Sequence, residues 1–595
     1  MFLLLRRMAV IFQKEDTANF VLLVLGILFN SLLELLGIGL MVPFISLLAH
    51  PEMLQTNVYL NRAYQLFSFH SFLQFMVVLS VVIVIVFVIK NAALLWMTFF
   101  QTRFIFDKKT VLSTRLFKAY MTSPYSFHLK RNMGQFQQKI AAVDGVMLYG
   151  VLNIIYMLTE GLLVSCLLAV LLRTNFVMTL AAMAILSAGL LVYFYFLQDK
   201  IHRWGEKNNW HNALLWQQVN QGLGSIKESK LLGKEMFFVD RFCHHSQQIS
   251  LQQSKSDVVT KSPKLFIETI VVGLVMSAMA LCLLAGQAPG DVFVTISLFA
   301  IVSVRLMPSL NKISCSWASF KFFLPCFNAI YDDLVACEKL EGQLRARVIG
   351  EPLSFFREIV MRDVVFFYEN TAVPALRDVS LEIPKNTMVG FIGPSGAGKT
   401  TAVDVILGLL EPSSGKVLVD GVDVHTHLGS WQRTIGYIPQ TIYLCDETIR
   451  SNVAFGLDAA EISDEKIWQS LRLAQLEEFV RSLPQGIETT VGERGVRLSG
   501  GQRQRIGIAR ALYYDPQVLV MDEATAALDN ETERSFMEAL AGLAGERTII
   551  VIAHRLSTVR QCDRIFFLKD GALVSQGTYI ELSESCPEFR KMAGG

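Results

Sequence analysis

The chain has 595 residues, too many for one hydrophobic core, and predicts at least two domains. Hydrophobic residues make up 52% and charged residues 18% of it, and the mean hydropathy of +0.41 predicts membrane spans. The formal net charge of +2 does not indicate a charged partner, and nine scattered cysteines without a C-x-x-C pair argue against a disulfide framework or a zinc site.

Long apolar runs fill the first half of the chain, and each exceeds or approaches the ~20 residues that a helix needs to cross a bilayer. We predict six spans, at residues 19–48, 73–100, 143–172, 176–197, 265–285 and 291–313. Arg6 and Arg7 precede the first run without a small-residue cleavage site, so no removable signal peptide is predicted.

Basic residues concentrate in two of the segments that separate these spans. The segments after spans two and four carry most of the lysine and arginine, whereas the alternate loops hold little beyond Arg62 and Arg173. By the positive-inside rule, the basic segments, the N-terminus and the C-terminal half are predicted to be cytoplasmic.

The two basic segments are longer than simple loops. Apolar residues recur in them at helical spacing, so we expect spans two to five to continue as helices well beyond the lipid. Their bends are predicted near residues 123–132 and 217–225, which carry turn and N-cap residues. The bends are either solvated hairpins or contacts that receive force from the C-terminal half.

Ionisable residues inside the predicted spans require a reason, because an unpaired charge at the bilayer centre costs about 2.5 to 3.5 kcal/mol. In one interpretation, lysines near span ends reach the interface, and Glu34 or Glu268 pairs internally with Lys90 or Arg305. In the other, four cations line an inner wall suited to a phosphate-bearing cargo. These four are Lys90, Lys264, Arg305 and Lys312.

A polar, charge-rich stretch follows the last span and predicts a helical extension that ends in a linker. We therefore expect a transmembrane domain at residues 1–327, a linker at 328–355 and a second domain at 356–595. Tyr368, near the start of the second domain, is a candidate to stack on an adenine ring or else a residue packed in a sheet.

Residues 393–401 read G-P-S-G-A-G-K-T-T between an apolar strand pattern and a helical run. Glycines in such a loop let backbone N–H groups face phosphate oxygens, and the following helix adds its positive end. Lys399 would reach the β- and γ-phosphates, and Thr400 would bind Mg²⁺. The candidate nucleotide-binding residues of the loop are Gly393, Pro394, Ser395, Gly396, Ala397, Gly398, Lys399, Thr400 and Thr401.

Acidic and polar residues follow the later strand patterns. Asp522 ends a short apolar strand and is placed to hold Mg²⁺, and the next residue, Glu523, is placed to polarise water. Gln440 follows another strand and could touch both Mg²⁺ and water. His554 follows a third, where a neutral imidazole could hydrogen-bond the γ-phosphate.

A second helix N-terminus suited to phosphate opens at residues 498–502, which read L-S-G-G-Q before a helical run. The candidate residues there are Ser499, Gly500, Gly501 and Gln502.

Together these motifs resemble the ATP-binding cassette family, in the family's own order. The phosphate loop, Gln440, L-S-G-G-Q, V-L-V-M-D-E, the A-L-D turn at 527–529 and His554 all match, and V-G-E-R-G at 491–495 resembles exporter-type members. With six preceding spans, the chain is similar to an exporter half-transporter over nearly all of its length. The resemblance implies a six-helix all-α transmembrane domain followed by an α/β P-loop nucleotide-binding domain.

The family resemblance implies a homodimer in which ATP and Mg²⁺ lie between the phosphate loop of one chain and the signature of the other. Glu523 would be the general base, Lys399 and His554 would stabilise the γ-phosphate, Ser499 would bind it from the opposite chain, and Thr400, Gln440 and Asp522 would hold the metal. Ala526 and Ala527 depart from the family, in which serine is common. No nucleic-acid partner is implied.

Two further stretches, V-P-F-I at 42–45 and R-L-M-P-S-L-N-K-I at 305–313, are similar to bacterial flippases for lipid-linked oligosaccharides. This similarity implies a polyprenyl-pyrophosphate-linked oligosaccharide as cargo, moved between leaflets of the bacterial inner membrane, with the four cations meeting the pyrophosphate. The alternatives are an exporter of lipid, drug or peptide, and an ATP-gated sensor or channel.

Overall fold

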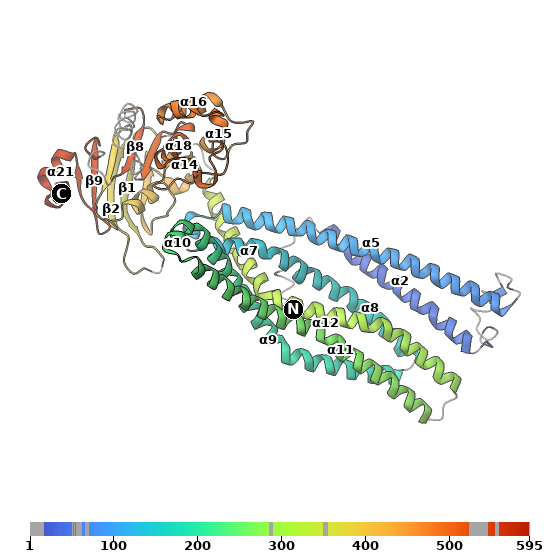
Figure 1. Cartoon of the computed structure of the whole chain (residues 1–595). Coiled ribbons are helices and arrows are strands. Elements are labelled where there is room, and N and C mark those ends of the chain that lie inside the picture. The colour runs from blue at the N-terminus through green and yellow to red at the C-terminus, as the bar shows by residue number, and fades with distance from the viewer. Residues whose placement is uncertain are drawn as a thin grey trace. The chain divides into compact units, whose positions relative to one another are not determined.

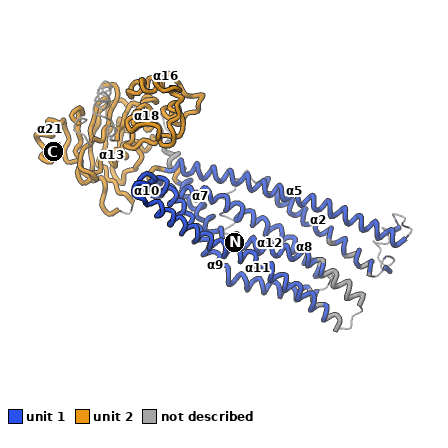
Figure 2. Tube along the Cα trace, in the orientation of Figure 1, with its two compact units in different colours: residues 1–123, 127–339 blue, residues 124–126, 340–595 orange. Residues whose placement is uncertain are grey.

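The computed structural model of the protein describes most of the chain. The described residues are 7, 17–49, 51–52, 54, 62, 64–65, 69, 71–174, 176–284, 289–348, 355–369, 371–522, 545–553 and 559–593. They divide into two compact units, one of residues 1–123 and 127–339, the other of residues 124–126 and 340–595 (Figure 2).

The first unit consists of long helices that run side by side (Figure 1). They are α2 (Thr17–Ala49), α5 (Phe72–Met121), α7 (Met133–Gly145), α8 (Leu152–Thr174), α9 (Phe176–Gly224), α11 (Glu235–Leu284) and α12 (Pro289–Val348). A π-helical stretch, η2 (Val146–Val151), joins α7 to α8 without a break. The linker predicted at 328–355 stays a prediction, since α12 runs through most of it.

Several of these helices are longer than a bilayer requires. Helices α5 and α11 have 50 residues each and α9 has 49. At ~1.5 Å per residue they are about 75 Å long, against about 30 Å of hydrocarbon. These helices are therefore longer than the hydrocarbon is thick, as the predicted extension beyond the lipid requires.

Within the described residues, four helical stretches are long and apolar enough to cross a membrane: Val21–Met41, Phe72–Met121, Met133–Ala169 and Thr179–Gly224. The last two predicted spans fall in α11 and α12. Large apolar side chains are exposed along α5, among them Val84, Val88 and Leu95. Such a surface suits lipid and would be unfavourable in water.

Two short helices lie at the bends between the long ones. Helix α6 (Tyr125–Leu129) falls at the bend predicted for residues 123–132. Helix α10 (Ile226–Leu232) follows α9, which stays helical through Gly224, so the second bend begins later than the predicted residues 217–225. Close packing explains this difference, because a Cβ on Gly222 would lie 3.3 Å from Phe238 of α11.

The second unit contains two β-sheets. The first, of order β2-β1-β4-β5, is antiparallel and contains β1 (Glu358–Phe366), β2 (Leu376–Pro384), β4 (Ser414–Val419) and β5 (Val422–Asp423). The second, of order β10-β9-β3-β8-β7-β6, contains β3 (Met388–Ile392), β6 (Ile435–Ile438), β7 (Val518–Asp522), β8 (Thr548–Ile552), β9 (Arg564–Lys569) and β10 (Ala572–Gly577). All its neighbours are parallel except β9 and β10.

The second sheet is covered on both faces, by helices on one and by α13 with the first sheet on the other, which explains why β3, β7 and β8 are buried at every position. Along β7, Leu519 and Met521 join one apolar cluster, whereas Val518 and Val520 join the other. The remaining elements of the unit are α13 (Lys399–Ile406), η3 (Val424–Thr426), α14 (Leu428–Arg433), α15 (Ile449–Val453), α16 (Asp464–Leu473), α17 (Glu477–Ser482), η4 (Gly486–Glu488), η5 (Glu493–Gly495), α18 (Gly500–Tyr513), α21 (Tyr579–Ser585) and α22 (Pro587–Ala593).

Candidate functional site

The glycine-rich loop joins β3 to α13, as its sequence predicts. Gly396 and Gly398 have φ angles of 79° and 94°, a region that side chains other than glycine rarely adopt. A Cβ on Gly393 would lie 2.1 Å from the carbonyl oxygen of Leu568, and one on Gly398 would lie 2.7 Å from that of Ala375. The loop is therefore a backbone cradle that only these glycines allow.

Lys399 is buried at the first position of α13. Its Nζ donates to the carbonyl oxygens of Gly393 at 2.9 Å and Pro394 at 3.0 Å, so the ammonium lies inside the curve of the loop. Thr400 is exposed beside it, and Thr401 is buried. The cradle, the ammonium and the hydroxyl fit the phosphates of a nucleotide with Mg²⁺.

Tyr368 lies two residues after β1 and reaches the same loop. Its hydroxyl lies 3.1 Å from Oγ1 of Thr401, and its ring meets Phe366 edge to face at 5.0 Å. The tyrosine side chain is 38% exposed. The ring is thus packed against the sheet and still partly exposed, which suits stacking of an adenine on it.

The parallel register brings Asp522 to the same edge of the sheet. Strand β8 pairs with both β3 and β7, so the loop after β3 and the carboxyl end of β7 meet there. Asp522 is buried and has a carboxylate neighbour, Asp404 of α13. Burial, and then the charge of Asp522, raise the pKa of Asp404 to about 6.

Two oxygen-donor groups that repel each other beside a phosphate loop suit a divalent cation. Asp404 was not among the residues predicted from the sequence. The available signal was an acidic residue within the first two turns of the phosphate-loop helix, whose other residues after Lys399 are apolar or carry a hydroxyl group.

The signature residues form the N-terminus of α18. Ser499 is the N-cap: its Oγ accepts from the N–H of Gln502 at 3.2 Å, and Oε1 of Gln502 accepts from the N–H of Ser499 at 2.8 Å. This capping box fixes the start of the helix at the exposed Ser499 and leaves the N–H groups of Gly500 and Gly501 outside the cap. A helix start of this kind is suited to an anion.

Of the remaining predicted catalytic residues, the structure describes only Gln440. Gln440 is exposed two residues after β6. Glu523 and His554 lie outside the described residues, as do Ala526, Ala527 and the A-L-D turn. Their roles therefore stay predictions.

In the membrane half, two of the four predicted cargo cations meet at one carboxylate. Lys90 Nζ of α5 lies 3.1 Å from Glu34 Oε2 of α2, and Arg305 Nη2 of α12 lies 2.9 Å from Glu34 Oε1. Lys312 is elsewhere on α12, 3.9 Å above the ring of Tyr156, and Lys264 is exposed on α11. The internal pairing considered for Glu34 is thus present, and the four cations do not form one continuous cluster.

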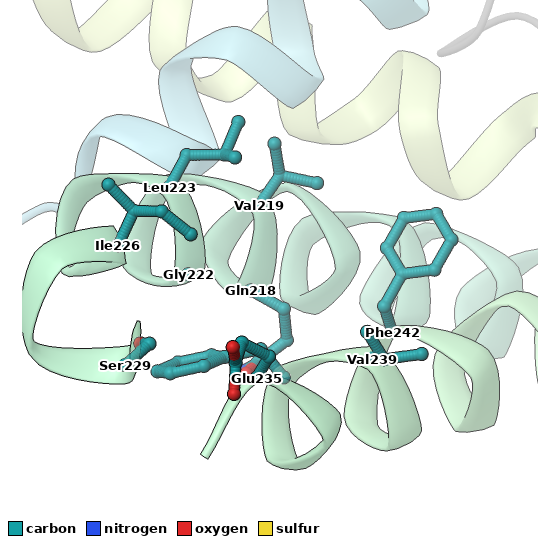
Figure 3. Close-up of a pocket in the computed structure, with 10 residues that line it drawn as sticks. Gln218, Val219, Gly222, Leu223, Ile226, Ser229, Glu235, Val239 and Phe242 are labelled. Atoms are coloured by element: carbon teal, nitrogen blue, oxygen red, sulfur yellow. The ribbon is translucent and has the colours of Figure 1, made fainter. Parts of the chain in front are cut away.

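An apolar pocket of about 320 Å³ lies at the bend that contains α10 (Figure 3). Leu223 of α9 and Ile226 of α10 line one side, and Val239 and Phe242 of α11 line the other. The other lining residues are Gln218, Val219, Gly222, Ser229, Glu235 and Phe238. Leu231 and Leu232 of α10 are 77% and 70% exposed, so this bend presents apolar surface of its own.

Known proteins resemble the chain in sequence and in fold. The ABC transporter family model matches residues 376–526. The ATP-dependent lipid A-core flippase of Cupriavidus metallidurans is 32% identical over 480 residues, covering 77% of this chain and 76% of that protein. The protein of the same name from Salmonella typhimurium is 35% identical over 374 residues, covering 61% of this chain and 62% of that protein.

Among solved structures, a bacterial Atm1-family ABC exporter with ATP bound matches with a TM-score of 0.77 and 23% identity, over 97% of this chain and 98% of that one. This likeness confirms the predicted fold class, a helical transmembrane domain of the exporter type followed by an α/β P-loop domain. The chain is a multi-pass membrane protein and an ATPase coupled to transport, with ATP and Mg²⁺ as its cofactors. It belongs to the ABC transporter family, as a half-transporter of the exporter type.

Proposed function

We propose that two copies of this chain form a homodimer that uses ATP to move an anionic lipid from the inner to the outer leaflet of the bacterial inner membrane. A polyprenyl-pyrophosphate-linked oligosaccharide is the cargo that we favour. The observation that carries this proposal is the cluster of Lys90 and Arg305 around Glu34, which leaves net positive charge inside the membrane half. Because such charge is costly inside a membrane, its presence there indicates a functional site.

At each nucleotide site, the loop N–H groups and Lys399 bind the phosphates, and Thr400, Asp522 and Gln440 surround Mg²⁺. Glu523 accepts a proton from the attacking water, and His554 donates to the γ-phosphate. Ser499 and the N-terminus of α18 approach the γ-phosphate from the partner chain. There the N-terminus of the helix binds the phosphate oxygens that the phosphate loop leaves free.

The bend at α10 is suited to transmit closure to the membrane helices. Its exposed leucines and the apolar pocket at the same bend offer an apolar contact for an ATP-binding domain. With the basic segments inside, both ends of the chain would be cytoplasmic. Rigid helices of 49 and 50 residues, α9 and α11, lead from this bend to the predicted spans.

A second cargo deserves a direct comparison, because two relatives are named lipid A-core flippases. A lipid A-core molecule is also a glycosylated lipid with phosphate groups. Both cargoes share the chemistry that the cation cluster would recognise, and they differ in lipid tail and sugar.

Purified protein in proteoliposomes tests the proposal with each lipid separately. We expect ATP-dependent flipping of the polyprenyl-pyrophosphate oligosaccharide, and we expect Arg305→Ala to reduce flipping by a much larger factor than it reduces ATP hydrolysis. Arg203→Ala, at an exposed position of α9, is the matched control and should flip normally. Flipping of the lipid A-core alone would favour the second cargo. ATP hydrolysis without flipping of either lipid would contradict the proposal and favour a sensor or channel.

A further inference from the structure

The carboxylate of Glu34 binds its two cations through different oxygens. Oε2 lies 3.1 Å from Lys90 Nζ, whereas Oε1 lies 2.9 Å from Arg305 Nη2, and the Glu34 side chain is only 3% exposed. The cations come from α5 and α12, so three helices meet at this carboxylate. One negative charge faces two positive charges, and the cluster as a whole is cationic.

Two polar atoms at this cluster lack a hydrogen-bond partner within the described part of the chain. Nε of Arg305 is buried without an acceptor, so only one arm of the guanidinium fork is in use. Asn30, one turn before Glu34 on α2, is 5% exposed, and its Oδ1 is buried without a donor. Because buried polar groups are nearly always hydrogen-bonded, these atoms indicate a site that another molecule completes.

A purely structural role explains this arrangement poorly. Buried ion clusters lose much of their attraction to desolvation, and well-packed apolar residues hold helices together at least as well. A clamp between three helices would also not leave an arginine N–H unpaired. The unpaired fork is the geometry that phosphate oxygens prefer, because two parallel N–H groups bind two oxygens.

We propose that Glu34 is a built-in competitor for Arg305, which keeps ordinary phosphodiester lipids out of the site and admits head groups with a terminal phosphate or a diphosphate. This inference rests on the proposed transport of an anionic lipid, and it assigns to Glu34 the selection among anionic lipids. Selectivity of this kind needs an element that acts against the wrong ligand as well as contacts to the right one.

The competition follows from charge and tethering. A phosphodiester lipid carries one negative charge, like the carboxylate, but Glu34 is held beside Arg305 at a high effective concentration. Any of these phosphate groups can offer two oxygens to the fork, but a terminal phosphate or a diphosphate carries more negative charge than the carboxylate and can therefore displace it. When it displaces Oε1, Glu34 keeps Lys90 through Oε2, so no carboxylate is left buried and unpaired.

The test measures ATP-dependent flipping of a polyprenyl-diphosphate oligosaccharide in vesicles with and without phosphatidylglycerol, a monoanionic phosphodiester. Wild type should flip equally well in both. For Glu34→Gln, which keeps the shape of the side chain and removes its charge, added phosphatidylglycerol should lower flipping at least about fivefold, because the internal competitor is gone. Glu268→Gln, an exposed carboxylate in the fifth predicted span, should behave like wild type.

Equal flipping by Glu34→Gln in both kinds of vesicle would overturn the inference while leaving the proposed function intact. No flipping by wild type in either would overturn both. Arg305→Lys provides a second variant should Glu34→Gln fail to fold: it keeps the charge and the competing carboxylate of Glu34 but lacks the fork, so flipping should fall in both kinds of vesicle to the same extent. Undiminished flipping by Arg305→Lys would contradict the role assigned to the fork, and inhibition of this variant by phosphatidylglycerol would contradict the role assigned to Glu34.

Discussion

Lys399 donates to two carbonyl oxygens of its own loop, which shows how the phosphate site satisfies a buried ammonium. An unpaired charge in the interior would be costly, so the loop supplies neutral acceptors. Phosphate oxygens are charged acceptors and form stronger hydrogen bonds with an ammonium than carbonyl groups do. Nucleotide binding therefore replaces weaker bonds at Lys399 with stronger ones.

The raised pKa of Asp404 predicts that the stability of the folded protein depends on pH. Burial, and then Asp522, raise its pKa from the ordinary 3.8 to about 6. Between these values the folded protein binds more protons than the unfolded chain, so the stabilisation is complete below a pH of about 4 and is lost as the pH rises through about 6. We expect Asp404→Asn to raise the melting temperature by a few degrees above a pH of about 7 in nucleotide-free, magnesium-free protein, and to change it little at a pH of about 4.

Calorimetry of the full chain across this pH range checks the prediction. Asp446→Asn, at an exposed position of the same domain, is the control and should leave the melting temperature unchanged. An equal gain for Asp404→Asn at both ends of the range would show that charge is not the cause.

Some residue roles could be predicted from the sequence and others could not. The glycines of the phosphate loop and Ser499 were predictable, because each role depends on local backbone geometry. The sequence offered Lys90 or Arg305 as a partner for Glu34 or Glu268, but it did not show that both cations bind Glu34, since this pairing depends on how three helices are rotated about their axes. The pKa of Asp404 likewise arises from the three-dimensional proximity of Asp522.

Among the elements, strands and helices differ in how well their limits follow from the sequence. Strands β3 and β7 were predictable as short apolar runs, because both faces of the sheet are covered. The end of α9 was predicted too early. Polar residues at 217–221 resemble a turn, but the packing of Gly222 against Phe238 continues the hairpin to Gly224.

The exposed surface of helix α10 predicts that a variant can lose cargo transport while it still hydrolyses ATP. Leu231 and Leu232 are largely exposed, and we propose that they dock on an ATP-binding domain. Changing both to aspartate would place charges in that apolar contact, where desolvation is unfavourable. We expect cargo flipping to fall at least about tenfold, with cargo no longer stimulating ATP hydrolysis.

The matched control changes both leucines to methionine, which keeps the surface apolar and should keep flipping near the wild-type rate. Nucleotide binding should persist in both variants, because α10 is not part of the nucleotide site. Normal flipping by the aspartate variant would mean that α10 is only a solvated bend.

For the whole molecule, one chain supplies one phosphate loop and one signature helix, so the location of complete sites depends on assembly. Two chains can form two complete sites, each with the loop of one copy and the signature of the other. The alternative is that each copy closes its own site. Mixed dimers of separately tagged chains distinguish these arrangements.

Lys399→Ala disables the loop, and Gly501→Asp disables the signature by placing a carboxylate at the anion-binding end of α18. If sites form between chains, a dimer of the two single variants keeps one site with both parts intact, whereas wild type paired with the double variant keeps none. We expect measurable ATP hydrolysis only from the first pair. Sites closed within each chain would give the reverse, because only the second pair would then contain an unaltered copy. Activity in the second pair alone would thus contradict a shared site and with it the proposed coupling of dimer closure to transport.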